Sequence, residues 1–271
     1  MTRQELCAAL DAQLAAAQEQ VCVLAVPLAG GVPLYERGAG RRAVSASTIK
    51  VFILLAALDD AAIDGKKGRF PFWVALNLLN NYFFFVGQVL FLVIYFVCKV
   101  SAGDVKLTPK LFARLAFESL LGVALGFILL WPAVLSVLQN PRTIDLSSGW
   151  GFLTYSKVQQ YLAILVSWIL PPDSPYMTSI WSEGVIKWTS MSAYLPLCSL
   201  AGAMAYWRAR KGDSKKRIVA TCAVFALVPI LNSAFYALNS SYYARWYYMP
   251  VLVLAAMTVN ALEDHNTDLD S

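Results

Sequence analysis

A serine and a lysine near the N-terminus have the spacing of a nucleophile and its base. Ser47 and Lys50 lie three positions apart in the run Ser45-Ala-Ser-Thr-Ile-Lys50, and on a helix this spacing puts both side chains on one face. A lysine removed from water can lose its proton near neutral pH and activate a serine hydroxyl. The pair therefore indicates serine hydrolase chemistry. The alternative is that Ser47 caps a helix and Lys50 is a solvated residue of its first turn.

A second group of residues has the chemistry to bind a phosphate at a membrane surface. Arg245 lies in an aromatic run between two apolar segments, where a guanidinium can bind a phosphate bidentately. The alternative is an anchoring arginine that extends its charged head to the membrane interface. The predicted binding residues are Arg245, four aromatic neighbours and two acids of an upstream segment, namely Tyr242, Tyr243, Trp246, Tyr247, Asp173 and Glu183.

Residue counts argue against several other chemistries. The only histidine is His265, in an acidic tail, so we expect neither a histidine-based triad nor a metal site with several histidine ligands. Its five cysteines are scattered and form no CxxC pair, a pattern that argues against a disulfide framework or a zinc site. We expect neither a metal nor a cofactor.

The composition indicates a membrane protein. Hydrophobic residues make up 58% of the 271 residues and charged residues 14%, whereas ordinary soluble domains are about 45–50% apolar. A run of about 20 apolar residues spans the hydrocarbon layer and must be helical there. We therefore predict a mainly α, polytopic membrane protein with five or six spans. The stretches without Asp, Glu, Lys or Arg are residues 70–98, 119–141, 191–207, 218–238 and 246–262.

Basic residues orient the predicted spans. The loop 208–217 has six basic residues and one acid, which predicts a cytoplasmic position, and residues 99–114 form a second basic loop. The segment 132–190 and Arg245 then lie outside, and the C-terminus is cytoplasmic. The apolar stretch 70–79 covers only about 15 Å of helix and predicts a re-entrant or truncated leg. The net charge of +5 is thus a topology signal, and no nucleic-acid partner is expected.

The first 64 residues have a different character. Ser47-x-x-Lys50 at the start of an apolar helix resembles the beginning of class A β-lactamases and related serine hydrolases. The partner motifs Ser-x-Asn and Lys-Thr-Gly do not occur in the sequence, so we expect a vestigial segment that a fluorescent penicillin does not acylate. The predicted elements are a helix over 2–18, strands over 21–27 and 32–35 in a β-hairpin, and a buried helix over 51–58.

Residues 66–262 carry several motifs in order, namely Asn80-Asn-Tyr-Phe-Phe84, Leu170-Pro-Pro-Asp173, Leu195-Pro-Leu197, Pro229-Ile-Leu-Asn-Ser-Ala-Phe235 and Tyr242-Tyr-Ala-Arg-Trp-Tyr-Tyr-Met249. Together they resemble the YfhO-type bacterial membrane proteins, which are similar to GT-C glycosyltransferases. The resemblance implies a GT-C-like fold in the bacterial cell membrane. It also implies sugar transfer from a polyprenyl-phosphate donor to a cell-surface polymer such as teichoic acid, with Arg245 at the lipid phosphate.

The chain departs from that family at both ends. The external loop that carries the catalytic acid of GT-C enzymes has no counterpart before residue 66, and later family helices are missing after residue 262. We therefore expect a fragment that is inactive alone. Its partners would be membrane lipid and the lipid-linked sugar donor.

These patterns divide the chain into four parts. The predicted parts are an incomplete serine β-lactamase-like segment over 1–64, a junction over 65–69, a multi-pass membrane domain over 70–262 and an acidic tail over 263–271. Two alternatives stay open. One is a membrane-tethered serine hydrolase with Ser47 as nucleophile. The other is a non-catalytic chimeric chain in which two unrelated reading frames meet at the junction.

Overall fold

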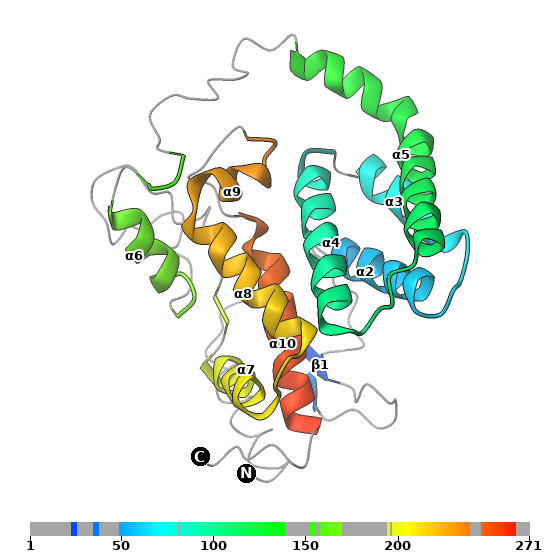
Figure 1. Cartoon of the computed structure of the whole chain (residues 1–271). Helices are drawn as coiled ribbons and strands as arrows, with labels where there is room; N and C mark the ends of the chain where they lie inside the picture. Colours follow the sequence, from blue (N-terminus) through cyan, green and yellow to red (C-terminus); the bar gives the residue numbers. More distant parts are fainter. Residues whose placement is uncertain are drawn as a thin grey trace.

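The computed structural model describes residues 23–25, 35–37, 49–80, 82–138, 152–155, 158–169, 194–195, 197–238 and 245–263. Most of these residues are helical, so the predicted mainly α class is confirmed (Figure 1). The helices are α2 (Ile49–Ala62), α3 (Arg69–Asn80), α4 (Tyr82–Ala102), α5 (Pro109–Leu138), α6 (Val158–Val166), α7 (Leu197–Ala209), α8 (Ser214–Leu227), α9 (Pro229–Ala234), the 3-10 helix η2 (Arg245–Tyr247) and α10 (Tyr248–Glu263). The strands are β1 (Val23–Ala25) and β2 (Tyr35–Arg37).

The two short strands pair antiparallel, with Val23 opposite Arg37. The second strand was predicted over 32–35, and β2 begins where that prediction ends. The connection between the strands and the helix predicted over 2–18 lie outside the described residues. The hairpin therefore stays a prediction.

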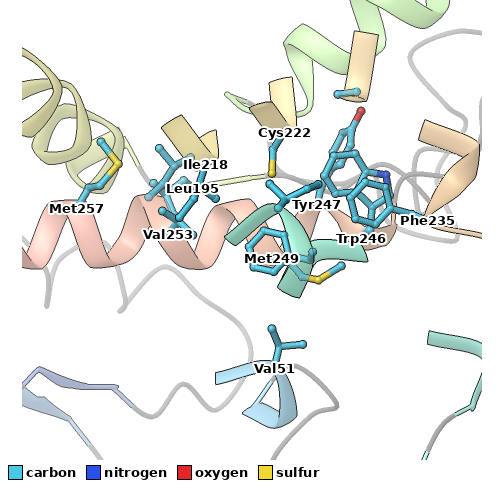
Figure 2. Close-up of a cluster of buried hydrophobic side chains, with 14 of the residues drawn as sticks. Val51, Leu195, Ile218, Cys222, Phe235, Trp246, Tyr247, Met249, Val253 and Met257 are labelled. Carbon is cyan, nitrogen blue, oxygen red and sulfur yellow. The ribbon is translucent and has the colours of Figure 1, made fainter. Parts of the chain in front are cut away.

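Among the residues that the structure describes, two hydrophobic clusters form the core, and α2 contributes to both. The larger cluster draws mainly on α4 and α6 to α10 (Figure 2), and the smaller one on α2, α3 and α5. From α2, Val51 and Leu55 join the larger cluster and Leu54 and Leu58 the smaller. The buried helix predicted over 51–58 is thus confirmed. Both clusters contain residues from before and from after the predicted junction at 65–69.

A polar contact also joins α2 to α4. The Asp59 carboxylate accepts hydrogen bonds from Lys99 Nζ and from the Tyr95 hydroxyl, each at 2.7 Å. The Lys99 side chain is only 15% exposed, so it depends on this partner, because a buried charge without a partner is strongly destabilising.

One helical segment among the described residues, Phe84–Ala102, is long and apolar enough to cross a membrane. Its exposed valines recur at helical spacing at positions 86, 89, 93 and 97, which gives α4 an apolar outer face suited to lipid contact. The other described helices do not meet this test. The predicted number of five or six spans stays a prediction.

Glycines allow close approach between two pairs of helices. A Cβ atom on Gly122 of α5 would lie 2.6 Å from Val74 Cβ of α3, and one on Gly202 of α7 would lie 2.6 Å from a methyl carbon of Thr258 in α10. The Thr258 hydroxyl also donates to the Ser199 carbonyl at 2.6 Å. Small residues and short polar contacts of this kind are typical of helix packing in membranes.

Two predicted helix boundaries were wrong. The external segment was predicted to begin at residue 132, where a helix would end, but α5 continues through Pro132 to Leu138, as proline is tolerated in membrane helices whose surroundings satisfy the freed carbonyl. The apolar run 218–238 forms two helices instead of one span. Val228 is extended, with φ −107° and ψ 115°, because proline at 229 disfavours helical backbone at the residue before it.

Candidate functional site

Five of the predicted site residues lie outside the described residues: Ser47, Asp173, Glu183, Tyr242 and Tyr243. Lys50 is described, as the half-buried second residue of α2. The serine–lysine pair therefore stays a prediction. The structure does describe Arg245, Trp246 and Tyr247.

Arg245 is an exposed residue on a buried support. It opens the 3-10 helix η2, which leads directly into α10. Its two successors are buried, with Trp246 2% and Tyr247 0% exposed. Contact with a ligand was expected for both aromatic residues, but their burial gives them a packing role. Arg245 alone of the three presents its side chain at the surface.

Trp246 fixes η2 through contacts with Asn232 of α9 and with Phe235, the residue that follows α9. Its indole stacks on the Phe235 ring, with centroids 3.8 Å apart and planes within 4° of parallel. Its Nε1–H donates to Asn232 Oδ1 at 2.6 Å, and Asn232 is 0% exposed. Figure 2 shows Trp246 and Phe235 side by side, with Tyr247 next to them. A buried hydrogen bond combined with ring stacking restricts the orientation of η2 more than apolar packing alone would.

The short helix α9 is itself held at both ends. The Ile230 N–H donates to the Phe152 carbonyl at 3.1 Å, which satisfies one donor of the first turn. At the other end the Leu238 N–H donates to the Ser233 carbonyl at 2.8 Å. Ala237 and Leu238 have φ values of 53° and 63°, a left-handed conformation that costs non-glycine residues about 1–2 kcal/mol each. The chain thus turns sharply after α9, on its way to Arg245.

Tyr155 and α6 pack against the region that supports Arg245. The Tyr155 hydroxyl donates to the Ala226 carbonyl at 2.9 Å, near the point where α8 breaks. The Tyr155 ring packs edge-on against Tyr161 of α6, with centroids 5.2 Å apart. Trp168, just after α6, lies 6.2 Å from the Tyr247 ring. The support of Arg245 therefore comes from α6, α8, α9 and residues 152–155.

Sequence reasoning assigned no role to Asn232, Phe235 or Tyr155. A signal for Asn232 was present, because an amide inside an apolar run usually faces the protein interior and finds a hydrogen-bond partner there. No comparable signal marked Tyr155 or Phe235, whose contacts cross between segments distant in the sequence.

The basic loops lie at the other end of α4. Near the start of α4, a Cβ atom on Gly87 would lie 2.9 Å from the Phe235 carbonyl oxygen. Near its end, the Ser101 carbonyl accepts a hydrogen bond from Arg217 Nη1 at 2.7 Å. The fourteen intervening steps rise about 21 Å. The two loops that were both predicted to be cytoplasmic thus meet at one end, and the support of Arg245 lies at the other.

A shallow, open surface depression of about 410 Å³ lies at the basic end, lined by Tyr206, Arg210, Asn260 and Glu263. Beside it Asp213 caps the N-terminus of α8 and accepts a hydrogen bond from the Tyr206 hydroxyl. Burial raises the pKa of Asp213, but the hydrogen bonds from Tyr206 and the Lys215 backbone outweigh it, so the pKa lies below its ordinary value. Within the described part of the chain no three His, Cys, Asp or Glu residues group to hold a metal ion.

Comparison with known proteins identifies the family. A family model described as bacterial membrane protein YfhO matches residues 53–269, which is more than half of the chain. The match begins inside α2 and extends across the predicted junction at residues 65–69. Searches among curated proteins and solved structures give no match. The chain is therefore a membrane protein and belongs to the YfhO family of bacterial membrane proteins.

Proposed function

We propose that this chain binds a polyprenyl-phosphate-linked sugar and takes part in transferring that sugar to a cell-surface polymer, as a GT-C-like glycosyltransferase. Arg245 would bind the phosphate of the donor. The observation that carries the proposal is an exposed arginine on a rigid, buried support in a membrane protein. The resemblance of the family to GT-C enzymes supplies the reaction class by analogy.

The rigid support favours ligand binding over simple anchoring. An arginine that only anchors a helix at the interface needs no fixed backbone, because its long side chain reaches the headgroups from many positions. Here Trp246 and Tyr247 fix the two positions next to Arg245, and Asn232 and Phe235 fix Trp246. A guanidinium whose backbone is held in this way loses less freedom when it forms two parallel hydrogen bonds to a phosphate.

A cation beside the donor phosphate favours this transfer. The acceptor oxygen forms a bond to the anomeric carbon while the bond between that carbon and the donor phosphate breaks. The acceptor proton passes to a base, and the leaving polyprenyl phosphate gains a negative charge. A fixed guanidinium interacts more strongly with the leaving phosphate than with the donor, and so lowers the barrier. In this proposal Arg245 is a binding and charge-stabilising residue, with no part in the proton transfer.

The test measures binding of undecaprenyl phosphate to the full chain in lipid nanodiscs. Arg245→Gln should weaken binding by about 10–100-fold, the range expected for losing one charge-assisted hydrogen bond, because the glutamine amide can still donate to the phosphate. Arg245→Lys keeps the charge but loses the planar fork, so its affinity should lie between the two.

The matched control is Arg69→Gln, which removes another exposed arginine in α3. It should bind the lipid phosphate like the unmodified chain. Equal affinity of Arg245→Gln and the unmodified chain would remove the proposed role of Arg245. An equal loss in Arg69→Gln would show that the measurement responds to overall charge and not to this site.

A further inference from the structure

Helix α6 has its apolar side outward and its polar side inward. Four exposed aliphatic residues at helical spacing, in α6 and the turn after it, form the α6 stripe, namely Val158, Leu162, Leu165 and Ile169. The opposite side is buried and includes the polar residues Gln160 and Ser167. Leu165 is 61% exposed, whereas Gln160 is 1% exposed. A helix on the surface of a water-soluble protein has the reverse arrangement, with its apolar side toward the core.

Specific contacts fix which side of α6 faces the protein. The Ser167 hydroxyl donates to the Ile164 carbonyl at 2.7 Å, and Ile164 belongs to the larger hydrophobic cluster. The Tyr161 hydroxyl accepts the Tyr155 backbone N–H at 3.1 Å. A rotation of α6 that buried the stripe would break the contact with Tyr155 and expose Ile164. The outward apolar side is therefore a property of the fold.

The helix lies at the same end of the molecule as Arg245. It packs beside α8 (Figure 1), and the Trp168 ring lies 6.2 Å from that of Tyr247. The basic loops lie at the other end of α4, where Arg217 contacts Ser101. Tyrosine and tryptophan are enriched at the two interfaces of a membrane. The position of α6 thus corresponds to one membrane surface, which is the outer one in the predicted orientation.

The length and composition of α6 indicate what covers the stripe. Its nine residues rise about 14 Å, less than half of the roughly 30 Å hydrocarbon core, so α6 stays within one leaflet. Residues 158–172 contain no Asp, Glu, Lys or Arg. The stripe is purely aliphatic, whereas tryptophan, tyrosine and arginine dominate the binding energy of protein interfaces. Lipid hydrocarbon therefore suits the stripe better than a protein partner does.

We propose that α6 is an interfacial helix whose stripe inserts among the lipid acyl chains of the outer leaflet. Interfacial helices of this kind bury an apolar side at the boundary between headgroups and acyl chains. The other side of α6 rests on the protein, and the contact of Trp168 with Tyr247 ties the support of Arg245 to this leaflet. The proposal does not depend on the function proposed for Arg245.

The test uses spin labels on the full chain in lipid nanodiscs. The buried Cys98 and Cys222 stay in place, because buried structural thiols are inert, and the other three cysteines are replaced by alanine. One new cysteine is then introduced and labelled at a time. Molecular oxygen concentrates in hydrocarbon, whereas a water-soluble nickel complex stays outside it. The logarithm of the ratio of oxygen to nickel accessibility should be positive for Leu162→Cys and for Leu165→Cys.

Three further positions serve as controls. Val93→Cys lies on the exposed face of α4, the described segment that is long enough to span, and should give a positive logarithm. Lys106→Cys lies in an exposed basic loop and should give a negative one. Val166→Cys lies on the side of α6 that packs against the larger cluster and should be poorly accessible to both probes. Circular dichroism of each labelled variant checks that the helical fold is kept.

Two results would overturn the proposal. A negative logarithm at residues 162 and 165, as at residue 106, would show that the stripe faces water. Poor accessibility to both probes at these positions, as at residue 166, would show that another segment of the chain or a second protein covers the stripe.

Discussion

The hydrogen bond between Trp246 and Asn232 allows the most direct test of how Arg245 is supported. Trp246→Phe keeps an aromatic ring that can stack on Phe235, but it removes the Nε1–H that donates to Asn232 Oδ1 at 2.6 Å. Asn232 is 0% exposed, so water does not readily replace the lost donor. The substitution therefore removes one specific interaction from an otherwise similar core.

The expected destabilisation has two parts. A buried acceptor that loses its partner costs about 1–3 kcal/mol, and the smaller ring leaves a cavity that adds about 1 kcal/mol. The hydrogen-bond part is isolated by a double-mutant cycle with Asn232→Ala. Because each single substitution already breaks the bond, the double variant should be about 1–2 kcal/mol more stable than the sum of the single effects predicts.

The assay is reversible unfolding of the full chain in mixed detergent micelles, followed by near-ultraviolet circular dichroism. The four proteins of the cycle are compared under identical conditions. Leu58→Ala serves as a control, because Leu58 belongs to the smaller hydrophobic cluster and Trp246 to the larger one. Its effect should add to that of Trp246→Phe.

Additive effects of Trp246→Phe and Asn232→Ala would refute the reasoning. Additivity within about 0.5 kcal/mol is what independent sites show, and it would mean that the two side chains do not interact energetically. The support of Arg245 would then rest on stacking alone.

Two further predictions concern helix packing and the basic loop. Gly122→Ala should lower the melting temperature, because the new Cβ would lie 2.6 Å from Val74 Cβ and 2.7 Å from the Pro71 carbonyl oxygen. Overpacking costs about 1–3 kcal/mol, which exceeds the gain of about 1 kcal/mol in helix propensity. A higher melting temperature would contradict the close contact. Asp213→Asn should lower the melting temperature at pH 7. The difference from the unmodified chain should shrink as the pH falls below about 4. The reason is that a carboxyl whose pKa is lowered on folding stabilises the fold only while it is ionised. An equal difference at pH 7 and pH 3 would show that the Asp213 charge plays no part.

The sequence predicted the class and the family from patterns that need no long-range information. Apolar runs without charges predicted helices, because an apolar segment in lipid must satisfy its own backbone. Lys50 and the run after it predicted the buried helix α2. The motif around Arg245 was informative because its residues are adjacent in the chain. Basic loops at 99–114 and 208–217 were placed at one end by charge alone, and the contact of Arg217 with Ser101 agrees.

Patterns along the chain were less informative about α2. The first 64 residues were interpreted as a serine-hydrolase-like segment and α2 was assigned to it, an interpretation that the family match from residue 53 does not support. In the structure its buried residues join both clusters, and Asp59 binds Lys99 of α4 at 2.7 Å. Local periodicity shows that a helix has apolar faces, but not which other helices cover them.

The division between exposed and buried residues in the Arg245 motif was decided only by the tertiary structure. Sequence placed Arg245, Trp246 and Tyr247 together at an interface as equal candidates for ligand contact. The break at Pro229 turns α9 so that Asn232 and Phe235 meet the indole, which buries both aromatic residues and leaves the arginine exposed. Residue type and spacing thus determined that a cation stands among aromatic rings near a membrane. Which of these side chains faces a ligand depends on contacts between segments distant in sequence, and those contacts exist only in the folded chain.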